Sequence, residues 1–164
     1  MLRAMYEYWL LLHILAAIVF AGCHGVSMFA LYRIRAMGLD RARIADTIAF
    51  SGTTTRPMYI SLAVVILAGF VLGVQGKFLG YWWMWLAFAV LVVTTVLMTL
   101  IAKPYFQRIT AACAIRPSGV PRVSDEELQE LIAGPKSKAH LITMIGVVGL
   151  VVIVYLMVAK PGWP

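Results

Sequence analysis

Three histidines are the residues of this chain whose type and position could do chemistry. His13 and His24 lie inside one long apolar run, Tyr8–Arg35, and His140 begins another. Ionisable residues within apolar spans are rare and are candidates for function. Imidazole is the commonest side-chain ligand of metals and an axial ligand of haem iron. We therefore consider His13, His24 and His140 as candidate cofactor-binding residues, holding either a haem or another metal such as copper.

The spacing of the first two histidines limits how they could act. His13 and His24 project within about 20° of each other around a helix, but about 16 Å apart along its axis. They cannot bind the same iron, so each needs a partner from another helix. His24 could pair with His140, whereas His13 could pair with Met84, Met157 or a carbonyl group. A haem ligand would be a neutral imidazole whose other ring nitrogen donates to a carbonyl or hydroxyl.

A plainer interpretation of the histidines stays open. Each ring could simply hydrogen-bond a backbone carbonyl or a threonine, because an unsatisfied polar group in hydrocarbon costs several kcal/mol. The available hydroxyls are Thr94, Thr95, Thr99 and Thr143. The sequence has no Ser-His-Asp set, P-loop or Cys-x-x-Cys, and no carboxylate within an apolar run, so we assign no catalytic residue and leave enzymatic activity open. Without Cys-x-x-Cys-His, a haem would be non-covalent haem b.

Composition sets the class of protein. Of the 164 residues, 62% are hydrophobic and 13% are charged, against about 25% charged in soluble domains. This predicts an integral membrane protein. The net charge of +7 does not indicate nucleic-acid binding, because the basic residues flank apolar runs and form no stripe with interleaved aromatics. Cys23 lies in an apolar run and Cys113 in a polar segment, so we expect no disulfide.

The apolar runs predict an all-α protein, an integral membrane four-helix bundle forming one transmembrane domain over residues 1–164. The expected spans are about 9–32, 58–74, 81–102 and 139–158, each near the length of about 20 residues that crosses a bilayer. We expect the third to close at Lys103-Pro104. Residues 39–51 predict a helix lying along the inner surface. The capping box at 124–127 predicts a further short helix.

Charge predicts the orientation of the bundle. Five basic residues lie between the first and second spans and six between the third and fourth, so eleven of the fourteen lie on one side. Cytoplasmic segments carry this excess, which puts both termini on the non-cytoplasmic side. We expect a multi-pass protein of the bacterial cytoplasmic (inner) membrane. Small residues, Ala17-Ala21-Gly25, Gly69-Gly73 and Gly146-Gly149, mark helix faces that could approach closely.

The first span also carries a resemblance. The stretches Leu12-His13-Ile14-Leu15-Ala16 and Phe20-Ala21-Gly22, the second histidine and Arg33-x-Arg35 resemble the first span of small bacterial membrane proteins. These include four-span families of unknown function, the HemJ-type protoporphyrinogen oxidases and the CopD-type copper proteins. In HemJ-type proteins the histidine of that span is taken as a haem ligand. The resemblance, which covers about 25 residues, implies that role for His13.

Two functions follow as expectations. The first is a b-haem-binding protein that acts in membrane redox or electron-transfer chemistry. The second is a non-catalytic accessory subunit that packs against a larger membrane complex of respiratory or photosynthetic type, and a metal or small-solute permease is a weaker third. The expected partners are the lipid bilayer and either other membrane subunits or further copies of this chain, with no nucleic acid.

Overall fold

The structure is a computed structural model that describes residues 2–162. Its elements are α1 (Leu2–Arg35), α2 (Arg41–Thr53), α3 (Thr55–Gln75), the 3₁₀ turn η1 (Phe78–Gly80), α4 (Trp82–Cys113), α5 (Asp125–Ile132) and α6 (Ala139–Ala159). No strand occurs in this part of the chain. The expected all-helical fold is confirmed.

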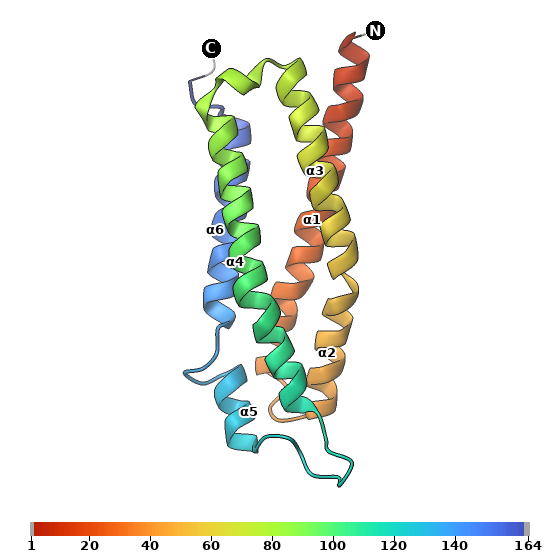
Figure 1. Cartoon of the computed structure of the whole chain (residues 1–164), viewed down its shortest axis with the longest axis vertical. Helices are drawn as coiled ribbons and strands as arrows, with labels where there is room; N and C mark the ends of the chain where they lie inside the picture. The colour runs from red at the N-terminus through yellow and green to blue at the C-terminus, as the bar shows by residue number, and fades with distance from the viewer. Residues whose placement is uncertain (1, 163–164) are drawn as a thin grey trace.

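Four stretches are long and apolar enough to cross a membrane, in α1, α2 with α3, α4 and α6. They correspond to the four predicted apolar runs, and this part of the prediction is confirmed. These four helices indicate a multi-pass membrane protein. The start of α1 and the end of α6 lie at one end of the bundle, which we call the terminal end, and α5 lies at the other, which we call the α5 end (Figure 1).

The helices pack as two pairs. α1 packs along α3, and α4 packs along α6 (Figure 1). The pairs are joined by contacts of α1 with α6 and of α2 with α4. Between residues 2 and 162, α3 and α4 meet through η1 rather than along their lengths. The bundle is thus closed on the α1–α6 side and loosely packed between α3 and α4.

The best-packed core lies toward the α5 end. Its fully buried side chains come from five different helices and include Leu31, Ile44, Ile109, Leu128 and Ile142. A smaller cluster at the terminal end centres on Trp83, with Phe78, Ala87 and Leu156. The middle of the bundle lacks such a cluster among the described residues. This leaves room for a cavity in the middle of the bundle.

One expected helix boundary is wrong. The helix of the third span does not close at Lys103-Pro104 but continues through Pro104 to Cys113. Proline removes one backbone hydrogen bond and normally kinks or ends a helix. Here the residues beyond it are held by the core at the α5 end, where Tyr105 and Ile109 are buried. Tertiary packing therefore outweighs the local cost of proline.

The second correction concerns the predicted surface helix. A helix does form, at Arg41–Thr53, but it does not lie separately along the membrane surface. It leads into α3 through Thr54, which keeps a right-handed helical conformation, and the two together make one 35-residue helical segment, part of which is apolar enough to cross a membrane. Pro57 does not interrupt them because it sits in the first turn of α3, where its missing N–H costs nothing.

The capping box behaves as predicted. The Ser124 hydroxyl accepts a hydrogen bond from the Glu127 N–H and starts α5 at Asp125. Leu128 and Ile132 of this short helix are buried in the core at the α5 end. The segment between α4 and α5 is therefore anchored at both of its ends.

Candidate functional site: an intramembrane cavity

A cavity of about 690 Å³ lies between the two helix pairs, where α3 and α4 do not pack. This volume falls within the range of about 300–1,000 Å³ of small-molecule and cofactor sites. Most of its wall is apolar, with a few polar side chains from different helices. The polar and basic residues on the wall are His24, Ser27, Ser51, Thr55, Thr94, Thr95, Thr99, Lys103, Gln107, Thr110 and Arg122.

His24 is the one histidine on this wall. The residue is buried, with only 8% of its surface exposed. Its ring stacks nearly parallel to the ring of Phe20, with the two centroids 6.3 Å apart. The Nε2 atom is buried and has no hydrogen-bond partner within residues 2–162. Trp83 and Thr143 also have such an atom, but neither residue lines the cavity. His24 thus combines an orphaned nitrogen with a place on the cavity wall.

The lack of a side chain at Gly146 leaves room for the His24 ring. A Cβ atom built on Gly146 would lie 2.1 Å from Nε2 and 2.8 Å from Cε1 of His24, closer than any real contact. The imidazole of α1 therefore lies against the backbone of α6. A larger residue at position 146 would force the ring elsewhere, and the space open to it is the cavity that both residues line.

The other predicted small-residue faces divide in two. Gly69 and Gly149 also face polar side chains. A Cβ atom on Gly69 would lie 3.1 Å from the His13 ring, and one on Gly149 would lie 2.4 Å from the Thr94 hydroxyl. Gly73 instead faces Met84. Gly25 has nothing within 4 Å of such an atom, so the ridge predicted on α1 is not a site of close packing there.

Two basic side chains line the cavity toward the α5 end. Lys103 comes from α4, and Arg122 comes from the segment between α4 and α5. Neither makes an ion pair within the described part of the chain. Lys103 lies about 32 Å along α4 from Trp82, which is close to the thickness of the hydrocarbon layer. The cavity is therefore apolar in the middle of the bundle and basic at this mouth.

Backbone bonds hold Arg122 in position. Its N–H donates to the Ala114 carbonyl, and the adjoining residues Ile115 and Pro121 form an isolated antiparallel bridge. The residues at 114–122 thus make a small, closed loop that returns to the end of α4. Arg122 comes back beside the cavity because of this loop.

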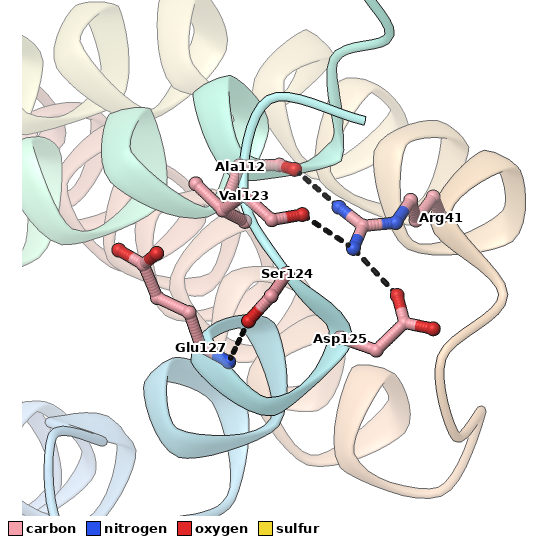
Figure 2. A network of polar contacts seen from close by, with 6 residues as sticks. All are labelled: Arg41, Ala112, Val123, Ser124, Asp125 and Glu127. Carbon is pink, nitrogen blue, oxygen red and sulfur yellow. Dashed lines mark hydrogen bonds and ion pairs between the residues drawn. The ribbon is translucent and has the colours of Figure 1, made fainter. Parts of the chain in front are cut away.

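Arg41 fixes the same loop from the other side. Its guanidinium donates to the carbonyls of Ala112, at 2.7 Å, and Val123, at 2.9 Å, and also to the Asp125 carboxylate, at 2.6 Å (Figure 2). The Arg41 side chain is only 10% exposed. One residue at the start of α2 therefore ties the end of α4 to the start of α5 and supports the neighbour of Arg122.

His13 has a different environment. Its Nδ1 atom lies 3.0 Å from the Val65 carbonyl of α3, so Nδ1 carries the proton and donates. This leaves Nε2 as an acceptor, the form that a metal ligand requires. His13 does not line the cavity, however. Its hydrogen bond to a backbone carbonyl matches both the ligand pattern and the plainer packing interpretation from the sequence.

His140 lies at the α5 end of α6 and is exposed. Its Nε2 atom accepts a hydrogen bond from Arg35 at 2.9 Å, and its ring meets the edge of Tyr32. His24 instead faces Gly146, about 9 Å further along α6 by helical rise. The structure therefore does not bring His24 and His140 together as two ligands of one iron.

The described residues also contain no cluster of three or more His, Cys, Asp or Glu side chains suited to a metal ion. A bare copper or zinc ion, which needs several such ligands, has no complete site here. A haem needs only one or two protein ligands because its macrocycle supplies the other four. Of the three histidines, His24 alone lies on the wall of this cavity.

Sequence reasoning found His24 but missed the rest of the cavity. The sequence marks Lys103 only as the end of the third apolar run, and Arg122 only as one of the six basic residues between the third and fourth runs. The only sequence signal that could have linked them is that both flank apolar segments on the same predicted side. Compared with known proteins, the chain matches no protein-family model, no curated protein and no solved structure.

Proposed function

We propose that this chain binds haem b in the cavity between its helix pairs, with His24 as the protein ligand of the iron. The observation that carries the proposal is the orphaned Nε2 atom of His24, buried on the wall of a cavity of about 690 Å³. A buried nitrogen without a partner costs about 1–3 kcal/mol. A ligand that bonds to it would remove that cost, and iron is a suitable partner for imidazole.

The ring can reach the cavity without breaking a hydrogen bond. Within residues 2–162, no hydrogen bond holds the imidazole in its present orientation. Rotation about the Cβ–Cγ bond of His24 exchanges the positions of Nε2 and Cε1, and orientations of this kind are assigned from hydrogen bonding. Such a flip leaves a ring atom equally close to Gly146, so Nε2 would reach the cavity by rotation about the Cα–Cβ bond, which turns the whole ring.

The remaining wall would serve the same ligand. Phe20, Leu62, Leu91, Leu150 and Ile153 supply apolar surface from four helices, which suits a planar macrocycle and excludes water from it. When bound, haem supplies one-electron redox chemistry at its iron. The protein's own contribution is to hold the imidazole neutral, to orient it on α1 and to surround the ring with hydrocarbon. On this basis we infer a role in membrane redox or electron transfer.

We place the haem at His24 rather than at His13 because His24 lines this cavity and His13 does not. His13 already has its hydrogen bond to Val65 and packs over Gly69. That arrangement accounts for a histidine in an apolar span without any cofactor. It also makes His13 a useful control, because its removal costs a hydrogen bond of about 1 kcal/mol and should leave the haem in place.

The test is spectroscopic. The full chain is purified in mild detergent from cells supplied with haem precursor, and its Soret band and pyridine haemochrome are recorded. We expect a b-type spectrum in the wild type, in His13→Ala and in His140→Ala, and its loss in His24→Ala. His24→Met, which offers iron a different axial ligand, should keep haem with a changed spectrum.

Folding is checked in each variant by size-exclusion profile and thermal unfolding. Loss of the bands from a well-folded His24→Ala protein supports the proposal. A wild-type protein that takes up no haem, either in cells or on titration, would refute it. If His13→Ala alone loses the bands, the ligand assignment is wrong and the haem lies at the other end of α1.

A further inference from the structure

The cavity is elongated along α4. Its wall on this helix begins at Leu91 and continues at helical spacing to Ala111, a distance of about 30 Å. A volume of about 690 Å³ spread over that length corresponds to a mean cross-section of about 23 Å², or a tube about 5 Å across. An α-helix is about 10–12 Å across with its side chains, so it does not fit inside. An extended hydrocarbon chain, whose carbon atoms make contacts at about 3.5–4.0 Å, does fit.

The depth of the cavity in the membrane matches one leaflet. α4 begins at Trp82, an aromatic residue of the kind that marks a membrane interface. By the rise per residue, Leu91 lies about 14 Å from Trp82 along the helix, and Ala102 lies about 30 Å from it. Since the hydrocarbon layer is about 30 Å thick, Leu91 lies near its midplane and Ala102 near its far boundary. The membrane part of the cavity therefore crosses the leaflet at the α5 end.

The cavity opens sideways toward that leaflet. α3 and α4 do not pack along their lengths (Figure 1), so the wall is interrupted between them. The floor has buried residues from three helices, Leu31 of α1, Leu62 of α3 and Ile142 of α6. The two helices beside the opening contribute exposed residues, Tyr59 of α3 and Thr99 of α4. A hydrocarbon chain of the surrounding bilayer can therefore enter without passing through water.

The hydroxyl groups on the wall do not require a polar ligand. Thr95 donates to the Leu91 carbonyl at 2.8 Å, and Thr99 donates to the carbonyl of Thr95 at 2.9 Å. Ser51 donates to the Ser27 hydroxyl at 3.2 Å. These hydroxyl protons are already bonded within the protein, so an apolar chain beside them leaves none of these donors unpaired.

Charge at the α5 end favours one class of lipid. The two segments that join the spans at this end, residues 33–56 and 103–138, carry eleven basic and six acidic residues. Basic residues beside a membrane attract anionic lipid headgroups. Beyond Ala102, Gln107 and Thr110 also add polar groups to the cavity wall. The end of the cavity outside the hydrocarbon layer therefore suits the glycerol and phosphate groups of an anionic phospholipid.

We propose that, in protein without haem, the cavity holds one acyl chain of an anionic phospholipid from the leaflet at the α5 end. The methyl end of the chain lies near Leu91, and the headgroup lies beyond Ala102. This inference does not rest on the proposed function, because it uses the shape, depth and opening of the cavity and assigns no role to His24. A bound haem would occupy the same space, so the two ligands exclude each other.

The first test compares how much lipid is retained by full-length variants without haem. Each is reconstituted in vesicles of phosphatidylglycerol and phosphatidylcholine in equal amounts, extracted in mild detergent and weighed by native mass spectrometry. We expect one phosphatidylglycerol per chain in the wild type. Thr95→Phe places a ring in the cavity and should lower the retained fraction by about 10-fold or more. Its matched control is Val96→Phe, because Val96 is 49% exposed and does not line the cavity; this variant should retain lipid as the wild type does.

A further variant separates the loss of space from the loss of the hydroxyl group. Valine has the shape of threonine but cannot donate to the Leu91 carbonyl, so Thr95→Val removes the hydrogen bond and keeps the space. It should retain phosphatidylglycerol as the wild type does. Size-exclusion profile and thermal unfolding check that each variant is folded. Equal retention by folded Thr95→Phe and Val96→Phe would overturn the placement of the chain in the cavity, and equal retention of phosphatidylcholine would overturn the anionic headgroup.

The second test locates the chain and needs only the wild-type protein. Phosphatidylglycerol with a diazirine at the end of one acyl chain is photolysed in vesicles with the haem-free protein, and peptide mass spectrometry maps the label. We expect label on Leu91 and Met98, which line the cavity, as well as on residues that face the bilayer. Label confined to outward residues such as Val93 and Val96 would overturn the proposal, whatever lipid survives extraction.

Discussion

Gly146→Ala is the most direct perturbation of the candidate site. The new methyl group would lie 2.1 Å from Nε2 and 2.8 Å from Cε1 of His24, whereas ordinary contacts begin near 3.4 Å. The imidazole must therefore move by more than 1 Å, or α6 must shift away from α1. Overpacking of this kind typically costs about 1–3 kcal/mol, from which the better helix propensity of alanine recovers at most about 1 kcal/mol.

Gly25→Ala is the matched control because a Cβ atom there has nothing within 4 Å. Both glycines lie inside helices, so the gain in helix propensity is the same. We expect Gly25→Ala to be neutral or stabilising by up to about 1 kcal/mol, and Gly146→Ala to be destabilising. The assay is reversible unfolding in mixed micelles, with the haem-free protein, followed by helical circular dichroism.

A double-mutant cycle identifies the clash as the cause. If the alanine methyl collides with the imidazole, then His24→Ala should remove the collision, and the two changes should be non-additive by at least about 1 kcal/mol. Additive effects, or a Gly146→Ala protein as stable as Gly25→Ala, would refute the packing of His24 against α6. The cycle requires no cofactor, so its outcome is independent of the haem proposal.

Three further predictions concern the rest of the molecule. Arg41→Ala should lower the free energy of unfolding by about 2–4 kcal/mol, because it leaves two carbonyls unpaired. Asp125→Asn should cost less than about 1 kcal/mol, since that carboxylate is 61% exposed, and the same unfolding assay checks both. In a chain whose native cysteines are replaced, a cysteine placed beside Lys77 should react with an impermeant thiol reagent added from outside intact cells and one beside Arg116 should not, with the reverse pattern contradicting the orientation inferred from charge. Native mass measurement in mild detergent should find the chain in an oligomer or with other membrane subunits, and a monomer of 18.1 kDa in every detergent would count against that expectation.

The helices could be predicted because their signals are local. Four apolar runs of sufficient length specify four membrane-spanning helices, and a serine three residues before Glu127 specifies the start of α5. Both depend on residues that are close in sequence. The continuation of α4 past Pro104 could not be predicted in this way, because it depends on Tyr105 and Ile109 packing into a core built from other helices.

The candidate site was predicted only in part, for a related reason. Uncommon residue types drew attention to His24, but nothing in the sequence says that Gly146 lies against it or that its Nε2 lacks a partner. The cavity arises because α3 and α4 do not pack along their lengths, which is a property of the whole bundle. Arg122 reaches its wall only because the loop at 114–122 returns to the end of α4.

The glycines explain how polar side chains fit among these helices. Gly69, Gly146 and Gly149 each leave room for a polar side chain of another helix, respectively His13, His24 and Thr94. In lipid, where apolar burial does not drive helices together, close backbone approach and polar contacts determine which faces meet. His13 follows this rule completely, because the room beside Gly69 comes with a hydrogen bond to Val65.

His24 has the room without the bond. Gly146 accommodates its ring, yet neither α6 nor any other described helix offers Nε2 an acceptor or donor. If the histidine served packing alone, a leucine or phenylalanine could fill the same space. Either residue would avoid the cost of burying an unsatisfied nitrogen, which is about 1–3 kcal/mol. The difference between the two histidines is therefore the reason to look for a ligand at His24, and the cavity beside it is where that ligand would bind.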